Sequence, residues 1–291
     1  MSEQSRDNWT LGGDLRIARM GFGAMRLPAS ALDGPANERA NGLAVLRRAV
    51  ELGVDHIDTA AFYERDGLAA NDLIREALSP YDENLVVATK VGPYKGPGDP
   101  VPTGELEPGM LRAEVERNLR ELGRDRLDLV YLRPGGLAPP AGESIGERFE
   151  ILAGLREEGL IRHLGVSHVT PAQLAEARRI APVAAVQNWF DVTKPQDTEM
   201  LRLCERENIA YAPYFPLGGF GLPDAPELKE IAGRHGATVA QVLLAALLAL
   251  SPAMLAIPGT SSTAHLEENV AAAGLGLTPE DLAEIATISA G

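Results

Sequence analysis

Three side chains in the first third of the chain combine an acid, a phenol and an amine, namely Asp58, Tyr63 and Lys90. Asp58 follows the short stretch Val54–Ile57, Tyr63 comes five positions later, and Lys90 follows the stretch Leu85–Thr89. A phenol is a weak acid, and a neighbouring ammonium group favours its ionised form. With a carboxylate to keep the amine charged, the three groups could give a proton to a carbonyl oxygen as hydride reaches the carbon.

Each of these residues has a plainer interpretation when it is taken alone. An aspartate at a strand end is more often a cap, and a lysine there is more often a solvated edge group. Catalysis is favoured only by the ordered set at successive strand ends, so the elements around them decide the interpretation.

Short apolar runs alternate with longer stretches of helical period, the pattern of a parallel sheet covered by helices. We predict strands at Met20–Gly23, Val54–Ile57, Leu85–Thr89, Leu127–Leu132, Ile161–Val166, Val183–Gln187, Ile209–Ala212 and Met254–Ile257. We predict helices at Glu38–Leu52, Leu68–Leu78, Leu111–Leu122, Ile145–Glu158, Ala172–Ile180, Thr198–Asn208 and Leu266–Ala273. This order predicts an α/β fold, a (β/α)8 TIM barrel, in which neighbouring strand ends would bring the three side chains together.

Additional elements are expected around this repeat. Thr10–Ile17 predicts a β-hairpin around a Gly-Gly-Asp turn that would cover the N-terminal end of the barrel. Pro226–His235 and Val239–Leu250 predict an extra helical pair before the last strand, and Thr170 and Thr238 are predicted N-caps.

Two long glycine- and proline-rich stretches, Gly92–Pro108 and Arg133–Gly142, each follow a predicted strand. In a barrel they would lie over the end where ligands bind, so they are candidate substrate loops. A plain solvated connection is an equally good interpretation of such segments.

Composition sets the limits on partners and location. The formal charge of −14 argues against nucleic acid and anionic membranes as partners. The lone Cys204 cannot close an internal disulfide, and the longest apolar stretch, Val242–Leu250, is far shorter than a membrane span. The polar N-terminus, Met1–Trp9, has no apolar signal segment. We therefore expect a cytoplasmic protein whose residues 1–291 form one domain.

The sequence resembles the aldo-keto reductase superfamily over nearly its whole length. The matching segments are Gly21–Leu27, Ile57–Ala60 with Tyr63, Ala88–Lys90, Asp128–Leu132, Gly159–Ser167, Val186–Asn188, Pro213–Gly218 and Ile257–Ser261. The resemblance implies a barrel that binds NADPH in an extended form, a small-molecule carbonyl substrate and a catalytic tetrad of Asp, Tyr, Lys and His. Asp58, Tyr63 and Lys90 match three of these catalytic roles.

The fourth position departs from the family pattern, because Arg133 stands where the family usually has histidine. A guanidinium is permanently charged and cannot shuttle a proton. Arg133 is therefore predicted either to polarise a carbonyl or grip a substrate carboxylate, or to be a loop arginine turned to solvent.

The resemblance also implies a set of cofactor-binding positions. Ser167 and Gln187 match the residues that bind the nicotinamide carboxamide, His168 replaces an asparagine of that set, and Tyr214 matches the aromatic on which the nicotinamide stacks. Tyr214 is equally plausible as a core aromatic. The remaining candidates near the nicotinamide and pyrophosphate are Gly23, Ala24, Met25, Asp58, Phe215, Pro216, Leu217 and Gly218.

At the adenosine end, the segment Gly259, Thr260 and Ser261 precedes a predicted helix and matches the family's 2′-phosphate site, although a plain helix cap explains it as well. Gly259 stands where the family frequently has a lysine, and His265 stands where the family has an arginine on the helix. Because histidine is mostly neutral at pH 7, its pull on a 2′-phosphate is weaker, so NADH stays possible. Glu268 and Asn269 match the pair near the adenine.

The other histidines are expected to be structural. His56 is predicted to be a hydrogen-bonded core residue, while His163 and His235 show no partner in the sequence. No spacing of His, Cys and carboxylates fits a metal site, so none is predicted.

Three functional hypotheses remain at this point. The favoured one is NADPH-dependent reduction of an aldehyde or ketone to an alcohol. The second is a nicotinamide-nucleotide sensor with little turnover, and the third is an unrelated barrel hydrolase or lyase without cofactor. The natural substrate and the choice between monomer and homo-oligomer stay open.

Overall fold

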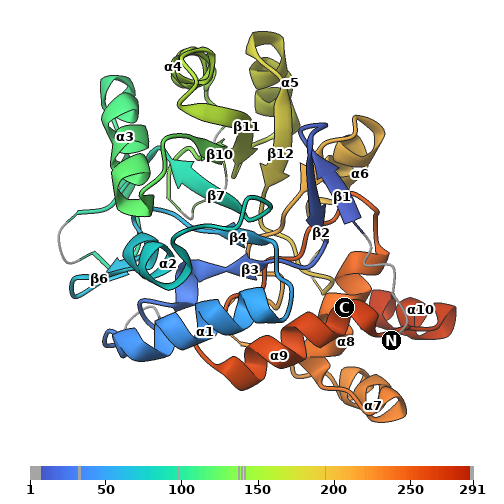
Figure 1. Ribbon diagram of the computed structural model, residues 1–291. Coiled ribbons are helices and arrows are strands. Elements are labelled where there is room, and N and C mark those ends of the chain that lie inside the picture. Colours follow the sequence, from blue (N-terminus) through green and yellow to red (C-terminus); the bar gives the residue numbers. More distant parts are fainter. Residues whose placement is uncertain are drawn as a thin grey trace.

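Seven short parallel strands form a curled sheet at the centre of the computed structural model, which describes residues 8–31, 34–96, 99–136, 138, 140, 142–193, 195–219 and 221–288 (Figure 1). The strands follow one another round the sheet in chain order from β3 to β13. They are β3 (Phe22–Gly23), β4 (His56–Asp58), β7 (Val86–Val91), β10 (Leu127–Leu132), β11 (Ile161–Ser167), β12 (Val183–Gln187) and β13 (Ala210–Tyr211).

The predicted eighth strand is reduced to two isolated bridges, Met254 with Tyr211 and Ala256 with Met20. The backbone N–H of Leu255 donates to the carbonyl of Tyr211 at 2.8 Å, and that of Ala256 donates to Arg19 at 2.8 Å. Because this segment bonds to both edges of the sheet, it closes the ring. The (β/α)8 prediction is confirmed, with a shorter eighth strand than expected.

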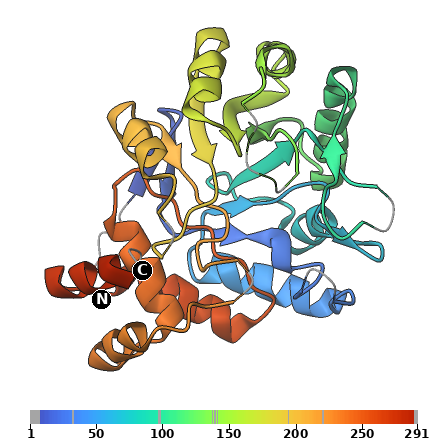
Figure 2. The ribbon, with the colours of Figure 1, turned by 180° about the vertical axis from the view of Figure 1, so that it is seen from behind.

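Helices surround the sheet, and each predicted helix is present with ends shifted by a few residues (Figure 2). They are α1 (Arg39–Glu51), α2 (Ala70–Leu78), α3 (Leu111–Leu122), α4 (Gly146–Glu157), α5 (Pro171–Ile180), α6 (Thr198–Arg206), α7 (Pro226–His235), α8 (Val239–Ala249) and α9 (Thr263–Ala271), with 3-10 turns η1 (Ala24–Arg26), η2 (Pro108–Met110) and η3 (Ala272–Gly274). A further helix, α10 (Pro279–Ile288), was not predicted.

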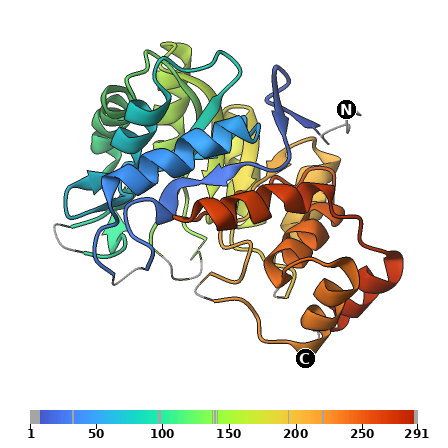
Figure 3. The ribbon, with the colours of Figure 1, turned by 60° about the horizontal axis from the view of Figure 1, so that its bottom comes forward.

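Figure 3 shows α9 alongside α1, with α7, α8 and α10 gathered beyond it at one side of the barrel. Both predicted N-caps are present, since the Thr170 and Thr238 hydroxyls each accept from the backbone N–H three residues on, both at 3.3 Å, and each forms a complete capping box. Among the described residues, no single helix is long and apolar enough to cross a membrane, and the pair α7 and α8 reaches that length only with an 89° bend.

The predicted N-terminal hairpin consists of β1 (Asn8–Leu11) and β2 (Leu15–Ala18). Leu11 and Ile17 are buried against the first layer of residues inside the barrel, which includes Val86 and Leu129. Burial of these apolar side chains stabilises the closed end of the barrel, so the open end is the one toward which the strands run.

Two small hairpins lie in the loops after β4 and β7. They are β5 (Glu64–Arg65) with β6 (Leu68–Ala69), and β8 (Pro93–Tyr94) with β9 (Gly104–Glu105). The second hairpin lies within the stretch Gly92–Pro108, which the sequence predicted as a candidate substrate loop or a solvated connection. Positions 1–7 of the expected polar terminus, 97 and 98 of this stretch, and 137, 139 and 141 of the stretch Arg133–Gly142 lie outside the described residues.

Candidate active site

Successive strands each place one polar side chain at the open end of the barrel. Side chains alternate along a strand, so Lys90 points inward with Val86 and Ala88, and Arg133 follows Leu129 and Tyr131. Glycine at position 165 leaves room for the Tyr131 ring, because a Cβ there would lie 2.6 Å from it. The inward residues that reach the open end are Asp58, Lys90, Arg133, Ser167 and Gln187.

Lys90 is a buried ammonium that bonds to the strand beside it. Its Nζ donates to Asp58 Oδ1 at 2.5 Å and to the carbonyl of Thr59 at 3.0 Å, and it lies 4.8 Å from the centre of the Tyr63 ring. Burial alone lowers the pKa of Lys90. The interactions with Asp58 and Tyr63 outweigh burial, so the pKa of Lys90 is raised above its ordinary value. The structure thus brings the three residues predicted to act together into one cluster, with a charged amine beside the phenol. Lys90 lies inside β7, where the sequence had placed it after the strand.

Asp58 has a second partner on the far side of the barrel. Its Oδ2 accepts from Gln187 Nε2 at 2.8 Å, so the carboxylate is fixed from two directions. Gln187 Oε1 is buried and has no hydrogen-bond partner among the described residues. A buried acceptor without a partner costs free energy, and a ligand that donates to it would remove that cost.

Arg133 is buried, with an exposed fraction of only 6%. Its Nη1 donates to Ser167 Oγ at 3.2 Å, its Nη2 donates to the carbonyl of Gly136 at 3.1 Å, and its guanidinium lies 4.9 Å from the centre of the Tyr214 ring. No carboxylate pairs with it within the described part of the chain. The interpretation of Arg133 as a solvent-facing loop residue is therefore wrong, since its neighbours come from three separate segments that enclose it.

His168 supports the ring of Tyr214. Its Nδ1 is 2.7 Å from the Tyr214 hydroxyl and its Nε2 is 2.5 Å from the carbonyl of Ala138. Burial lowers the pKa of His168, and the Arg133 charge acts in the same direction. His168 and Phe215 both have positive φ, +59° each, a conformation that is costly for these residue types and often found beside functional sites.

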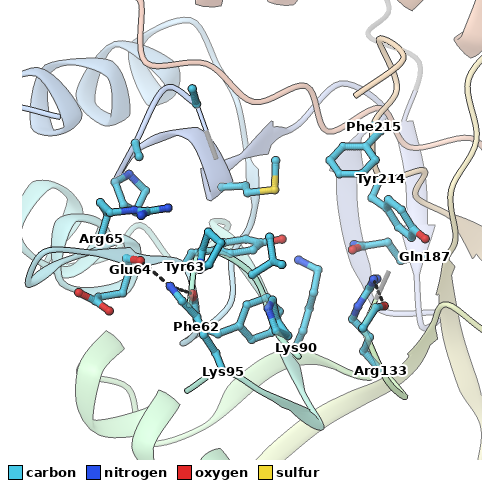
Figure 4. A pocket seen from close by; sticks show the side chains of 18 residues that line it. Phe62, Tyr63, Glu64, Arg65, Lys90, Lys95, Arg133, Gln187, Tyr214 and Phe215 are labelled. Atoms are coloured by element: carbon cyan, nitrogen blue, oxygen red, sulfur yellow. Dashed lines mark hydrogen bonds between the residues drawn. The ribbon is translucent and has the colours of Figure 1, made fainter. Parts of the chain in front are cut away.

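Two cavities open at this end of the barrel and share Met25, Tyr63, Tyr214 and Phe215. The first has a volume of about 850 Å³. Figure 4 shows Phe62, Tyr63 and Lys95 on one side of it, and Arg133, Gln187 and Tyr214 on the other. Its lining residues are Met25, Pro28, Ala29, Ala31, Phe62, Tyr63, Glu64, Arg65, Lys90, Lys95, Pro100, Val101, Pro102, Arg133, Gly136, Gln187, Tyr214 and Phe215.

The second cavity, of about 1490 Å³, runs from the barrel centre to the start of α9. Most of the predicted cofactor residues line it: Gly23, Met25, Asp58, Tyr214, Phe215, Pro216, Leu217, Gly259, Thr260, His265, Glu268 and Asn269. Ala24, Ser167, His168, Gly218 and Ser261 are not among the described lining residues of either cavity, although Ser167 and His168 bond to lining side chains. Gln187, with its unpartnered Oε1, is among the described lining residues of the first cavity and not of the second, and the two cavities share Tyr63 and Tyr214. The elongated second cavity fits an extended dinucleotide.

Several lining residues were not identified from the sequence. Arg26, Phe62, Lys95 and Pro100–Pro102 line the cavities. Lys95 donates to the backbone carbonyls of Phe62 and Glu64, at 3.3 and 2.7 Å, and so ties two loops together. The sequence signals for these residues were their place in loops after strands β3, β4 and β7 and, for Arg26, the family-matching segment Gly21–Leu27, and neither gives a side-chain direction.

The other histidines differ from the sequence prediction in their hydrogen-bond partners. His56 is buried as expected, but neither ring nitrogen has a hydrogen-bond partner among the described residues. His163 and His235, for which the sequence showed no partner, pair with Asp14 at 2.6 Å and Asp281 at 2.7 Å. No group of three or more potential metal ligands occurs among the described residues.

Comparison with known proteins agrees with this geometry. The model of the aldo/keto reductase family matches residues 19–290. Pyridoxine 4-dehydrogenase of Escherichia coli (strain K12) is 43% identical over 287 residues, which cover 98% of this chain and 99% of that protein.

Solved structures agree as well. A thermostable aldo-keto reductase in complex with the inhibitor epalrestat has a TM-score of 0.82 and 26% identity, covering 97% of this chain and 99% of the other. An aldo-keto reductase from Klebsiella pneumoniae in complex with NADPH has a TM-score of 0.80 and 26% identity, covering 98% and 96%. The chain therefore belongs to the aldo/keto reductase family.

Proposed function

We propose that this oxidoreductase uses NADPH to reduce an aldehyde or ketone to an alcohol, with the reaction centre at Tyr63. The observation that carries the proposal is the position of Tyr63, beside the Lys90–Asp58 pair and on the wall shared by the two cavities. A group in this place touches both a carbonyl compound in the first cavity and a dinucleotide in the second.

Tyr63 acts as the acid in this proposal. Its hydroxyl gives a proton to the carbonyl oxygen, and the Lys90 ammonium stabilises the phenolate that is left. Asp58 holds Lys90 charged and in place. Arg133 lines the same cavity and lowers the energy of the negative charge that develops on the oxygen. The phenolate then regains its proton from solvent through the open end of the cavity.

The cofactor part of the proposal rests on the second cavity. In this proposal Gln187 Oε1, on the wall of the first cavity, accepts from the carboxamide where the two cavities meet, Tyr214 offers a ring for stacking, and the segment Phe215–Leu217 lines the second cavity. Bound there, NADPH supplies the hydride that reaches the carbonyl carbon. The Klebsiella relative, whose structure was determined with NADPH, supports this choice.

For the substrate, we propose an aromatic aldehyde of the pyridoxal type, which yields the alcohol pyridoxine. The Escherichia coli relative, 43% identical over almost the whole of both chains, is named for the oxidation of that alcohol. The first cavity fits a planar aromatic ring, because it lies between Phe62 and Tyr63 on one side and Tyr214 on the other.

Steady-state consumption of NADPH with pyridoxal and a panel of other aldehydes and ketones tests the proposal. Tyr63→Phe should lose activity by 10²-fold or more and still bind NADPH, since it removes only the proton. Tyr94→Phe, at an exposed tyrosine on β8, is the matched control and should keep full activity. Undiminished turnover by Tyr63→Phe would remove the proposed acid.

The same assays separate the alternatives. Binding of NADPH without consumption across the whole panel would instead favour a nucleotide sensor. Absence of NADPH binding would favour the third hypothesis, a barrel hydrolase or lyase that works without a cofactor.

A further inference from the structure

The second cavity has one arginine and no lysine among its described lining residues, and that arginine is Arg26. The sequence predicted a weak 2′-phosphate site, because Gly259 and His265 stand where the family has cations. We propose that Arg26, from a different part of the chain, supplies the charge that binds the 2′-phosphate of NADPH and sets the preference over NADH. This inference rests on the cofactor of the proposed function.

The backbone around Gly259 explains why the cation is elsewhere. A Cβ at Gly259 would lie 2.7 Å from the carbonyl oxygen of Gly23, so the close approach of two backbones excludes any side chain there. The same Cβ would lie 3.6 Å from Cγ of Arg26. The stem of Arg26, at the end of η1, therefore passes directly beside the position that carries no side chain.

A chain of hydrogen bonds connects Arg26 to the start of α9. Its Nη1 donates to the carbonyl of Ser30 at 2.5 Å, and Ser30 Oγ lies 2.8 Å from Ser261 Oγ. Asn41 Nδ2 donates to the carbonyl of Ser261 at 2.6 Å and fixes this segment from α1. The guanidinium is thus held close to the hydroxyl-rich segment that precedes α9.

The charge of Arg26 is not neutralised by the protein. Its other bond runs from Nη2 to the carbonyl of Gly219 at 2.8 Å, and no carboxylate pairs with it within the described ranges. The side chain is half-buried, and burial lowers its pKa. A guanidinium held by neutral carbonyls gains most from a doubly charged, multi-acceptor group such as a phosphate monoester.

Titration with two small nucleotides tests the inference without the nicotinamide or turnover. Adenosine 2′,5′-bisphosphate carries the 2′-phosphate and 5′-AMP lacks it. Isothermal titration calorimetry should show that Arg26→Gln loses about tenfold or more in affinity for the bisphosphate, the loss expected for a charge-assisted bond, and little for AMP. Quenching of tryptophan fluorescence should show the same contrast between NADPH and NADH.

Two further variants make the result decisive. Arg26→Lys keeps the charge and should retain most of the preference for the bisphosphate. Arg112→Gln, on the exposed surface of α3 where the arginine pairs with Glu158, removes the same charge away from both cavities and should change neither affinity.

Equal losses for both nucleotides, or no loss for either, would overturn the assignment of Arg26. Native protein that binds neither the bisphosphate nor NADPH would overturn the proposed cofactor itself. The two failures are therefore distinguishable.

Discussion

Arg133 puts a permanent positive charge beside the proposed reaction centre with no carboxylate partner in the described part of the chain. It is held by Ser167 Oγ, by the carbonyl of Gly136 and by the face of Tyr214. Because charge develops on the substrate oxygen during reduction, removal of this cation should raise the barrier. We expect Arg133→Met to lower kcat/KM for the best carbonyl substrate by about 10²-fold, the usual effect of losing one oxyanion donor.

Steady-state kinetics should place most of that loss in kcat if Arg133 acts on the developing charge. Arg133→Lys is the matched control, since it keeps a cation and should recover part of the rate. If Arg133→Met reduces carbonyls as fast as the native protein, the role assigned to the guanidinium is wrong and the residue only packs against Tyr214.

The sequence predicted side-chain chemistry better than side-chain position. Asp58, Tyr63 and Lys90 were predicted to converge because strand ends of a barrel are neighbours, and the structure brings them together. The burial of Arg133 was not predictable, because its partners come from three separate segments of the fold: Ser167 in β11, Gly136 in the loop after β10 and Tyr214 in the loop after β13. Arg26 was missed for the same reason, since its neighbours Gly219 and Gly259 lie more than 190 positions away along the chain.

Among the elements, the helices were predicted more completely than the strands. The eighth strand is recognisable as Met254–Ile257 in the sequence, yet only Met254 and Ala256 make ladder contacts, because the neighbouring strands β13 and β3 are two residues long. Helix α10 was missed although its start carries a signal. The Thr278 hydroxyl accepts from the Asp281 N–H at 3.1 Å, the same arrangement that was recognised at Thr170.

The N-terminal hairpin acts as an element that closes one end of the barrel. Leu11 is 1% exposed and packs within the inner layer, so Leu11→Ala should lower the free energy of unfolding by about 2–5 kcal/mol. Thr10→Ala, at an exposed position of the same strand, should cost much less. Urea denaturation followed by circular dichroism measures both changes. A small loss for Leu11→Ala would mean that the hairpin covers the barrel without stabilising it.

At the scale of the whole molecule, the family match from residue 19 to 290 agrees with a barrel that includes both cavities. That residues 1–291 form one domain stays a prediction.

The lone Cys204 is buried in α6, where burial raises the pKa of the thiol from 9.0 to about 12. The neutral thiol is therefore part of the core, as are the phenols of Tyr131 and Tyr211.

These buried neutral groups predict how the fold responds to alkali. Burial raises the pKa of Tyr131, with Asp58 adding to the effect, and burial raises the pKa of Tyr211, with Asp197 adding to it. Where the folded-state pKa is raised, the unfolded chain loses its proton first. The stability from these groups is therefore complete below the unfolded pKa, near 9 for the thiol and about 10 for the phenols, and is lost as pH rises further.

We therefore expect the free energy of unfolding to fall steeply from about pH 9 upward, before Cys204 reaches its folded pKa of about 12. Urea denaturation at a series of pH values measures the slope. Tyr131→Phe removes one of the buried phenols, so its slope above pH 10 should be shallower than that of the native protein, while the exposed control Tyr94→Phe should follow the native curve. Each variant lacks one tyrosine, so the two unfolded chains carry the same net charge at every pH. Parallel curves for all three proteins would show that ionisation of the Tyr131 phenol does not contribute to the pH dependence of the free energy of unfolding.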